Sequence, residues 1–311
     1  MATHRGLKWR ASQARNRDMT DKQRIGMIGV GLMGHGIATN VLRHGYPLAF
    51  LEHPGNQPTQ DLVAAGARPV SGCAELAAGS DVVILCVTGS PQVENVLLRE
   101  DGVLAGLRPG GIVIDCSTAI PSSTLRIAEA VAAAGGRFMD APMTRTPKEA
   151  AEGRLNLIVG AEPALFAQCR ALLASFAENV VHAGPVGAGH QLKLLHNYVS
   201  LGFAAVFAEA AACAQRAGVD TGVFVQVLAN GGGGGVVLER MRPYLEARDA
   251  SGFRFTIANA SKDMGYYTAM ANELGAARAT AESVRQTFAR AAHGHGQSAV
   301  PSLVDLLAAS S

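Results

Sequence analysis

A glycine motif between a strand-like and a helix-like segment constrains the fold of this 311-residue chain more than any other feature. Gly29-x-Gly31-x-x-Gly34 ends the apolar run 24–31 and opens the helical pattern 35–45. Gly29 permits a tight turn, Gly31 lets a pyrophosphate approach the backbone, and Gly34 lets the helix pack on the strand. The free N–H groups at the helix start suit phosphates. The motif predicts a dinucleotide site; the alternative is a glycine turn in an unrelated α/β protein.

An acidic residue follows the next apolar run and bears on the choice of cofactor. Glu52 comes 18 residues after Gly34, at the end of run 47–53. An acid at this place accepts hydrogen bonds from the ribose hydroxyls and repels a 2′-phosphate, so NAD is favoured over NADP. His53 or Arg68 could still meet a phosphate, which leaves NADP as the alternative.

Apolar runs alternate with helical patterns over the first part of the chain. The runs are 24–31, 47–53, 81–87, 110–117, 137–143, 155–160 and 179–184. Such alternation gives a parallel sheet covered on both faces. After Gly189 the pattern becomes helical, beginning with one long segment that ends at Gly218. We predict an α/β fold with a Rossmann NAD(P)-binding domain, 23–187, and an all-α domain, 188–311, led by a long helix.

The composition excludes several classes of protein. The chain is 48% hydrophobic and 17% charged, with a net charge of +2, which is too small to imply a nucleic-acid or membrane partner. Five scattered cysteines without a CxxC pair indicate a reducing, cytoplasmic setting and no structural zinc. The apolar stretch 198–214 is interpreted as a buried helix rather than a membrane span. The basic residues 1–22 are expected to be a disordered tail, and Met19 is an alternative start.

Four motifs in order carry a resemblance to a known family over about residues 24–308. They are the cofactor segment 26–46, "DCSTAIP" at 115–121, "GPVGAGHQLKLLHN" at 184–197 and "SKDMG" at 261–265. The chain resembles the β-hydroxyacid dehydrogenases, which include 3-hydroxyisobutyrate dehydrogenase and the tartronate semialdehyde reductases. The resemblance implies a site between two domains, a long helix joining them, a small anionic hydroxy acid or aldehyde as substrate, and a homodimer or homotetramer.

The resemblance also assigns residues by position. It makes Lys193 the catalytic acid/base. The implied substrate-binding residues are Ser117, Thr118, Thr144, Arg145, Thr146 and Asn197. The implied cofactor-binding residues are Gly29, Gly31, Leu32, Met33, Gly34, Glu52, Val87, Thr88, Thr118 and Lys262, and no metal is expected.

The chemistry of the Lys193 segment agrees with that assignment. Hydride transfer from an alcohol needs a group that takes the hydroxyl proton, and a lysine can do so if burial lowers its pKa toward neutrality. Lys193 and Asn197 are spaced i,i+4 and share a helix face. The alternative for Lys193 alone is a snorkelling surface lysine. His196, where the family often has an asparagine, either tunes the site or is an ordinary helix-face residue. The pair His293 and His295 is interpreted as a polar loop rather than a metal site.

Thr144-Arg145-Thr146 departs from the Ser-Gly-Gly run common in the family. It is similar to the Gly-Arg-Thr run of the sulfolactaldehyde reductase branch, as is "KLLHNYVS" at 193–200. The arginine fork suits a sulfonate, phosphate or carboxylate, so we expect Arg145 to bind the substrate anion. The alternative is a solvated ion pair with Glu149 or Glu152, which would contribute little. The glycine run 231–235 is either a plain linker or a loop whose backbone approaches a ligand; if Arg145 binds the substrate anion, we expect the run to be a mobile flap on the other side of the site.

Three rival functions stay open at this stage. A sulfolactaldehyde-type reductase is the runner-up in the same class. An imine reductase shares the fold, but such enzymes generally lack a lysine at the position of Lys193. A nicotinamide sensor without turnover would not need Lys193, Asn197 and Ser117.

Overall fold

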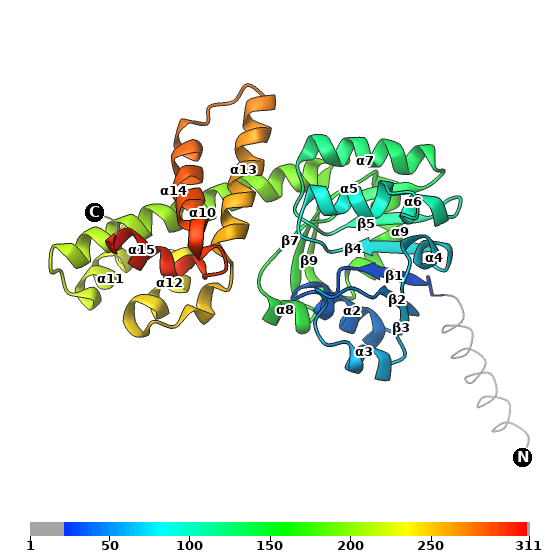
Figure 1. The fold of residues 1–311 in the computed structure, drawn as a ribbon, viewed down its shortest axis with the longest axis horizontal. Coiled ribbons are helices and arrows are strands. Elements are labelled where there is room, and N and C mark those ends of the chain that lie inside the picture. Colours follow the sequence, from blue (N-terminus) through cyan, green and yellow to red (C-terminus); the bar gives the residue numbers. More distant parts are fainter. Residues whose placement is uncertain (1–21, 310–311) are drawn as a thin grey trace, which may run out of the picture. The chain divides into compact units, whose positions relative to one another are not determined.

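The computed structural model describes residues 22–309, which form two compact units, one ending at His190 and one beginning at Gln191 (Figure 1). The predicted boundary between residues 187 and 188 lies close to this division. The predicted tail lies outside the described residues except for Lys22. Each unit has its own hydrophobic core.

The first unit contains a nine-stranded sheet within its described residues. The strands are β1 Ile25–Ile28, β2 Leu48–Leu51, β3 Arg68–Val70, β4 Val82–Leu85, β5 Ile112–Asp115, β6 Arg137–Asp140, β7 Met143–Thr144, β8 Leu155–Gly160 and β9 Ala177–Gly184. They lie in the order β3-β2-β1-β4-β5-β6-β8-β7, and β9 pairs with β8. From β3 to β6 all neighbours are parallel, as predicted.

Two features of the sheet were not predicted. β8 runs antiparallel to β6 and β7, because the connection 145–154 is shorter than a parallel crossover needs. β3 was not predicted, since it has only three residues, includes Pro69 and is half exposed at the sheet edge.

Helices cover both faces of the sheet (Figure 1). They are α2 Gly34–Arg43, α3 Gln60–Ala64, α4 Cys73–Ala78, α5 Ser90–Leu98, α6 Val103–Gly106, α7 Pro121–Ala133, α8 Pro147–Ala151 and α9 Pro163–Leu173. Val82 and Ile84 of β4 pack in the core with α2 and α9, whereas Val83 and Leu85 pack with α4, α5 and α7. Because successive strand residues face opposite covered sides, the strands are apolar throughout, which confirms the predicted double covering.

The described part of the second unit is helical. Its elements are α10 Ala188–Arg216, which begins in the first unit, α11 Thr221–Ala229, α12 Val236–Ala247, the 3-10 helix η1 Ala250–Phe253, α13 Ile257–Glu273, α14 Ala279–His295, the 3-10 helix η2 Val300–Ser302 and α15 Leu303–Ala309. The glycine run 231–235 separates α11 from α12. His293 and Gly294 have non-helical backbone angles, so the predicted polar loop is a kink near the end of α14. No group of three potential metal ligands occurs in residues 22–309.

α10 is the one helix of the described chain that is long and apolar enough to cross a membrane by length and composition. A core helix passes the same test. The buried face of α10 belongs to the core of the second unit, where it contributes Leu194, Leu201, Ala204, Phe207 and Ala211. These contacts favour the predicted buried helix.

Candidate active site

Packing inside the first unit requires two of the three motif glycines. Gly29 has a φ of +91°, and a Cβ there would lie 2.2 Å from the carbonyl oxygen of Cys86. A Cβ on Gly34 would lie 1.9 Å from the carbonyl oxygen of Gly29. No side chain fits at such distances. Gly29 therefore lets the turn pack closely against the end of β4, and Gly34 lets α2 pack closely against the turn.

Gly31 has no such internal reason to be glycine. A Cβ there would meet only the carbonyl oxygen of Gly55, at 4.0 Å. Leu32 beside it is 64% exposed, and Met33 at the start of α2 is partly buried against the core. Packing within the protein therefore does not require glycine at this position. A glycine here leaves room for a ligand that approaches the backbone, as a pyrophosphate does at this motif. The turn and the N-terminus of α2 therefore fit a dinucleotide.

A hollow of about 370 Å³ adjoins the end of β2 and includes Glu52 and His53 in its lining. Asn56, which the sequence analysis did not identify, connects the loop between β2 and α3 to the glycine turn. Its Oδ1 accepts from the Val30 N–H at 3.2 Å, and its Nδ2 donates to the Leu51 carbonyl at 3.0 Å. The exposed carboxylate of Glu52 thus lies at the rim of a hollow fixed beside the turn.

The two side chains considered as alternative phosphate ligands are engaged elsewhere. His53 Nδ1 accepts from the Gly55 N–H at 2.9 Å, which places the ring proton of neutral His53 on Nε2. Arg68 Nη1 lies 3.1 Å from Glu75 Oε1. Arg68 is thus held by Glu75, whereas His53 keeps an Nε2–H donor at the lining of the hollow.

Ser117 lies just beyond β5, where three hydrogen bonds fix it. Its Oγ accepts from the Val87 N–H at 3.0 Å, its N–H donates to Asp115 Oδ1 at 2.9 Å, and its carbonyl is 3.1 Å from His190 Nε2. The first bond joins the carboxyl ends of β4 and β5, the edge at which parallel α/β sheets bind ligands. Val87 is half-buried, Thr88 is exposed and Thr118 is half-buried at this edge.

A buried polar network beneath Ser117 went unrecognised in the sequence. The Asp140 carboxylate accepts from the backbone N–H groups of Gly187 and His190, both at 2.7 Å. His190 Nδ1 lies 2.8 Å from Thr124 Oγ1. Burial raises the pKa of the Asp140 carboxyl, and the nearby His190 and the two N–H groups oppose this shift. The network anchors the first turn of α10 to β6 and to the Ser117 backbone. Its one sequence signal is an acid at the end of an apolar run, which alone is not specific.

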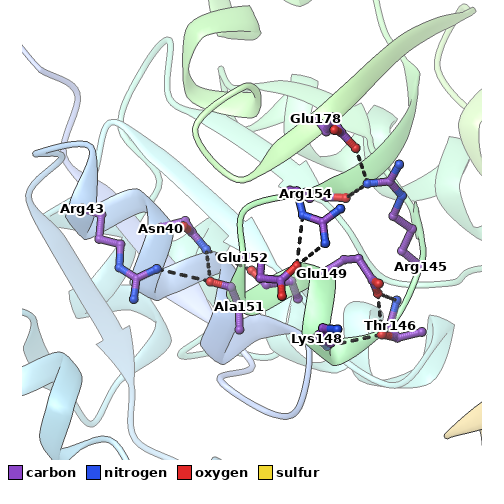
Figure 2. A network of polar contacts seen from close by, with 11 residues as sticks. Asn40, Arg43, Arg145, Thr146, Lys148, Glu149, Ala151, Glu152, Arg154 and Glu178 are labelled. Atoms are coloured by element: carbon purple, nitrogen blue, oxygen red, sulfur yellow. Dashed lines mark hydrogen bonds and ion pairs between the residues drawn. The ribbon is translucent and has the colours of Figure 1, made fainter. Parts of the chain in front are cut away.

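The Thr144-Arg145-Thr146 segment is held by neighbours within the first unit (Figure 2). Asn156 Nδ2 donates to Thr144 Oγ1 at 3.1 Å. Thr146 is the N-cap of α8 and forms a capping box with Glu149. The guanidinium of Arg145 is ion-paired with Glu178 of β9 and also donates to the Arg154 carbonyl.

The ion pair of Arg145 differs from the predicted alternatives. Glu149 is engaged by Thr146, and Glu152 pairs with Arg154, so Glu178 is the partner instead. Glu178 lies 33 residues from Arg145 in sequence and was not considered as a partner. The expected contact of Arg145 with a substrate anion stays a prediction, and it would require the guanidinium to exchange Glu178 for the ligand.

The backbone of Arg145 is unusual. Its φ of +83° lies in the left-handed region, and Arg145 and Arg248 are the two non-glycine residues of the described chain with positive φ. This conformation costs a non-glycine residue about 1–2 kcal/mol and favours glycine. An arginine at such a position indicates that its side chain has a use that offsets the strain.

Lys193 and Asn197 lie on α10 within the second unit. The Lys193 side chain is half-buried, and its ammonium makes no hydrogen bond or ion pair with other residues in 22–309. Its pKa is lowered to about 8, first by burial and then by the charges of Lys262 and Arg240, while Asp263 opposes the shift. A lysine in this state can hold or release a proton near neutral pH.

Asp263 is a further residue that the sequence analysis named only within its motif. It is 2% exposed, and its Oδ2 accepts from Asn197 Nδ2 at 2.7 Å. Its Oδ1 lies 3.0 Å from Lys262 Nζ, and this ammonium also lies 5.2 Å from the centroid of the Tyr266 ring. A buried carboxylate thus joins two of the predicted site residues, Asn197 and Lys262.

Two family models match the chain. One, described as the NAD binding domain of 6-phosphogluconate dehydrogenase, matches residues 24–184, and the other, described as NAD-binding of NADP-dependent 3-hydroxyisobutyrate dehydrogenase, matches residues 187–307. Together they span both units.

Curated and solved relatives agree. The NAD-dependent L-serine dehydrogenase of Pseudomonas aeruginosa is 34% identical over 250 residues, covering 78% of this chain and 83% of the relative. The 3-sulfolactaldehyde reductase of Escherichia coli is 30% identical over 274 residues, covering 88% and 92%. A crystal structure of 3-hydroxyisobutyrate dehydrogenase from Salmonella typhimurium has a TM-score of 0.79 and 27% identity, covering 91% of this chain and 99% of that one. The chain therefore belongs to the β-hydroxyacid dehydrogenase family and is an NAD(P)-dependent oxidoreductase.

Proposed function

We propose that this protein exchanges a hydride between NAD(H) and a short β-hydroxy acid, or its semialdehyde, that carries an anionic group. The observation that carries the proposal is the state of Lys193. It is half-buried, its pKa is lowered to about 8, and its ammonium has no hydrogen-bond partner in 22–309. A structural lysine would be expected to have a partner, whereas a general acid must keep its proton available for the substrate.

The chain's own residues divide the work as follows. The glycine turn, the start of α2 and Glu52 would hold the dinucleotide, which supplies or accepts the hydride when bound. Lys193 gives a proton to the carbonyl oxygen during reduction and takes it back during oxidation. Ser117, Thr118, Thr144 and Asn197 offer hydrogen-bond donors to the substrate anion and hydroxyl.

The preference for NAD over NADP has separate support. Glu52 is exposed at the rim of its hollow, where it would repel a 2′-phosphate. Arg68 is ion-paired with Glu75, which leaves it less able to offset that repulsion.

A sulfolactaldehyde-type reductase is the second candidate. Arg145 keeps its side chain at a position of positive φ, which suggests a selected role for the guanidinium. A sulfonate is one of the anions that its fork of donors suits. The competing observation is the ion pair with Glu178, which a ligand would have to displace.

The proposal includes a homodimer or homotetramer in the cytoplasm. The support is the family membership and the five cysteines, all of which are free in the structure. Sedimentation of the purified protein tests the assembly, and a monomer at micromolar concentration would contradict it.

The deciding experiment is reduction of an aldehyde panel with NADH and with NADPH. The panel is sulfolactaldehyde, tartronate semialdehyde, succinic semialdehyde and methylmalonate semialdehyde. We expect turnover of at least one compound, a loss of ~10³-fold or more in Lys193→Ala with NADH binding retained, and no change in the surface control Lys148→Ala. Undiminished activity in Lys193→Ala would refute the proposal.

A further inference from the structure

We propose that His196 and Asp263 are positioning residues that fix the side-chain amide of Asn197, so that it offers an N–H donor to the substrate. This inference rests on the proposed function, because it concerns how Asn197 meets the ligand. It assigns a role to Asp263 and, of the two interpretations of His196, adopts the one that places it in the site.

The contact with Asp263 decides which way the amide points. An ionised carboxylate only accepts hydrogen bonds, and Asp263 Oδ2 lies 2.7 Å from the side-chain amide of Asn197. The amide oxygen cannot occupy that place, because two acceptor oxygens would then face each other in a buried setting. Nδ2 therefore faces Asp263, uses one of its two N–H groups there and keeps the second for another acceptor.

His196 engages the other end of the amide. Its Nδ1 lies 3.1 Å from Asn197 Oδ1, so the ring must carry its proton on Nδ1 to donate. Its pKa is lowered, first by desolvation and then by the positive charges of Lys193 and Arg240, while the hydrogen bond with Asn197 opposes the shift; the net effect favours the neutral ring. Asn197 Oδ1 thus accepts from His196, and Asn197 Nδ2 donates to Asp263, so each end of the amide has its own partner.

The remaining oxygen of Asp263 links this chain to the lysines. Oδ1 is buried and has no hydrogen-bond partner among residues 22–309, but it forms an ion pair with Lys262 Nζ at 3.0 Å. The negative charge of Asp263 raises the pKa of Lys193 against the effect of burial. Asp263 therefore orients Asn197 and also stabilises the ammonium form of Lys193.

The alternative is that these contacts only stabilise the packing of α10 against α13. An exchange of partners tests whether rebuilding the hydrogen bond between the helices is enough to restore activity. The double variant Asn197→Asp/Asp263→Asn keeps one carboxylate and one amide, so the hydrogen bond between the helices can re-form in reverse. It presents a carboxylate instead of an N–H to the ligand.

We would compare Asp263→Asn, the double variant, His196→Ala and His196→Asn in the full-length protein. The last is the conservative control, because the Nδ2 of an asparagine occupies about the place of the histidine Nδ1 and can donate in its stead. The readouts are thermal stability, NADH affinity, kcat and KM for the best aldehyde of the panel, and malonate binding to the NAD-loaded protein by calorimetry.

Orientation of Asn197 predicts a split between stability and ligand binding. Asp263→Asn should lose stability and ~100-fold in kcat/KM, and the double variant should regain the stability but not the kcat/KM. His196→Ala should lose ~10-fold in kcat/KM with unchanged melting and NADH affinity, and His196→Asn should restore it. Recovery of kcat/KM in the double variant, or an unchanged kcat/KM in His196→Ala, would overturn the inference.

Malonate binding separates this inference from the proposed function. If the wild type turns over none of the aldehydes, the function fails. Weaker malonate binding in His196→Ala than in the wild type, restored in His196→Asn, would still support the oriented amide. Equal malonate binding by His196→Ala and the wild type, including none by either, would overturn it.

Discussion

Replacing Glu178 by glutamine tests what Arg145 is for. The side chains of Arg145 and Glu178 are 25% and 47% exposed, so their ion pair is partly solvated. A pair of this kind contributes about 1 kcal/mol at most. If Arg145 grips the substrate anion, it must first leave Glu178, and that cost weakens substrate binding by about fivefold. Glu178→Gln removes the competitor.

If Arg145 binds the substrate anion, Glu178→Gln should therefore bind the substrate more tightly. Glu178→Gln should lower KM about fivefold at unchanged kcat. Arg145→Ala should lower kcat/KM ~100-fold, and Arg145→Lys should recover only part of it because a lysine lacks the fork of donors. Steady-state kinetics on the aldehyde panel with saturating NADH measures both effects.

A purely structural Arg145 gives a different pattern. Both Glu178→Gln and Arg145→Ala would then lower the melting temperature by a few degrees at most, about 2–4 °C per kcal/mol for a chain of this size, and would leave KM within twofold. Arg145→Gly would be the most stable variant of that set, because glycine tolerates the φ of +83° without strain. That combination would refute the anion-binding role.

Three further predictions follow from the site. The ammonium of Lys193 donates the proton in reduction, so kcat/KM for reduction should fall as pH rises through about 8, and kcat/KM for oxidation should rise over the same interval. Burial sets this midpoint first, followed by the charges of Asp263, Lys262 and Arg240, and Lys193→Ala should lack it. Gly31→Ala should melt like the wild type but lose NADH affinity ~10-fold or more by titration, since its Cβ would meet only Gly55 at 4.0 Å. Gly34→Ala, whose Cβ would lie 1.9 Å from a carbonyl oxygen, should instead lose stability by several kcal/mol, about 3 or more, in denaturant unfolding. Glu52→Ser should raise the NADPH to NADH ratio of kcat/KM ~10-fold, and an unchanged ratio would contradict the repulsion argument.

Much of the fold followed from local patterns. The glycine motif, the apolar runs and the change of period after Gly189 predicted the α/β unit, the helical unit and the long helix α10. These signals are local because backbone sterics and side-chain periodicity act over a few residues. The antiparallel direction of β8 was not predicted, because an apolar run looks the same in a parallel and in an antiparallel strand.

The residues that shape the candidate cofactor site divide into two kinds. Gly29 and Gly34 are fixed by contacts with Cys86 and with the turn itself, which a sequence motif captures because the contacts recur with the motif. The loop that carries Asn56 is fixed by a hydrogen bond to Val30, 26 residues away, and no local signal marks it.

The sequence alone thus indicated the family and the cofactor class, because their motifs are short runs with fixed spacing, and the resemblance to the family made Lys193 the candidate acid/base. The partners of the functional side chains were decided only by the tertiary structure. Arg145 meets Glu178 across 33 residues, and Asn197 meets Asp263 across 66. Such pairs depend on which strand or helix lies alongside, and charge complementarity within a sequence does not select one carboxylate among many.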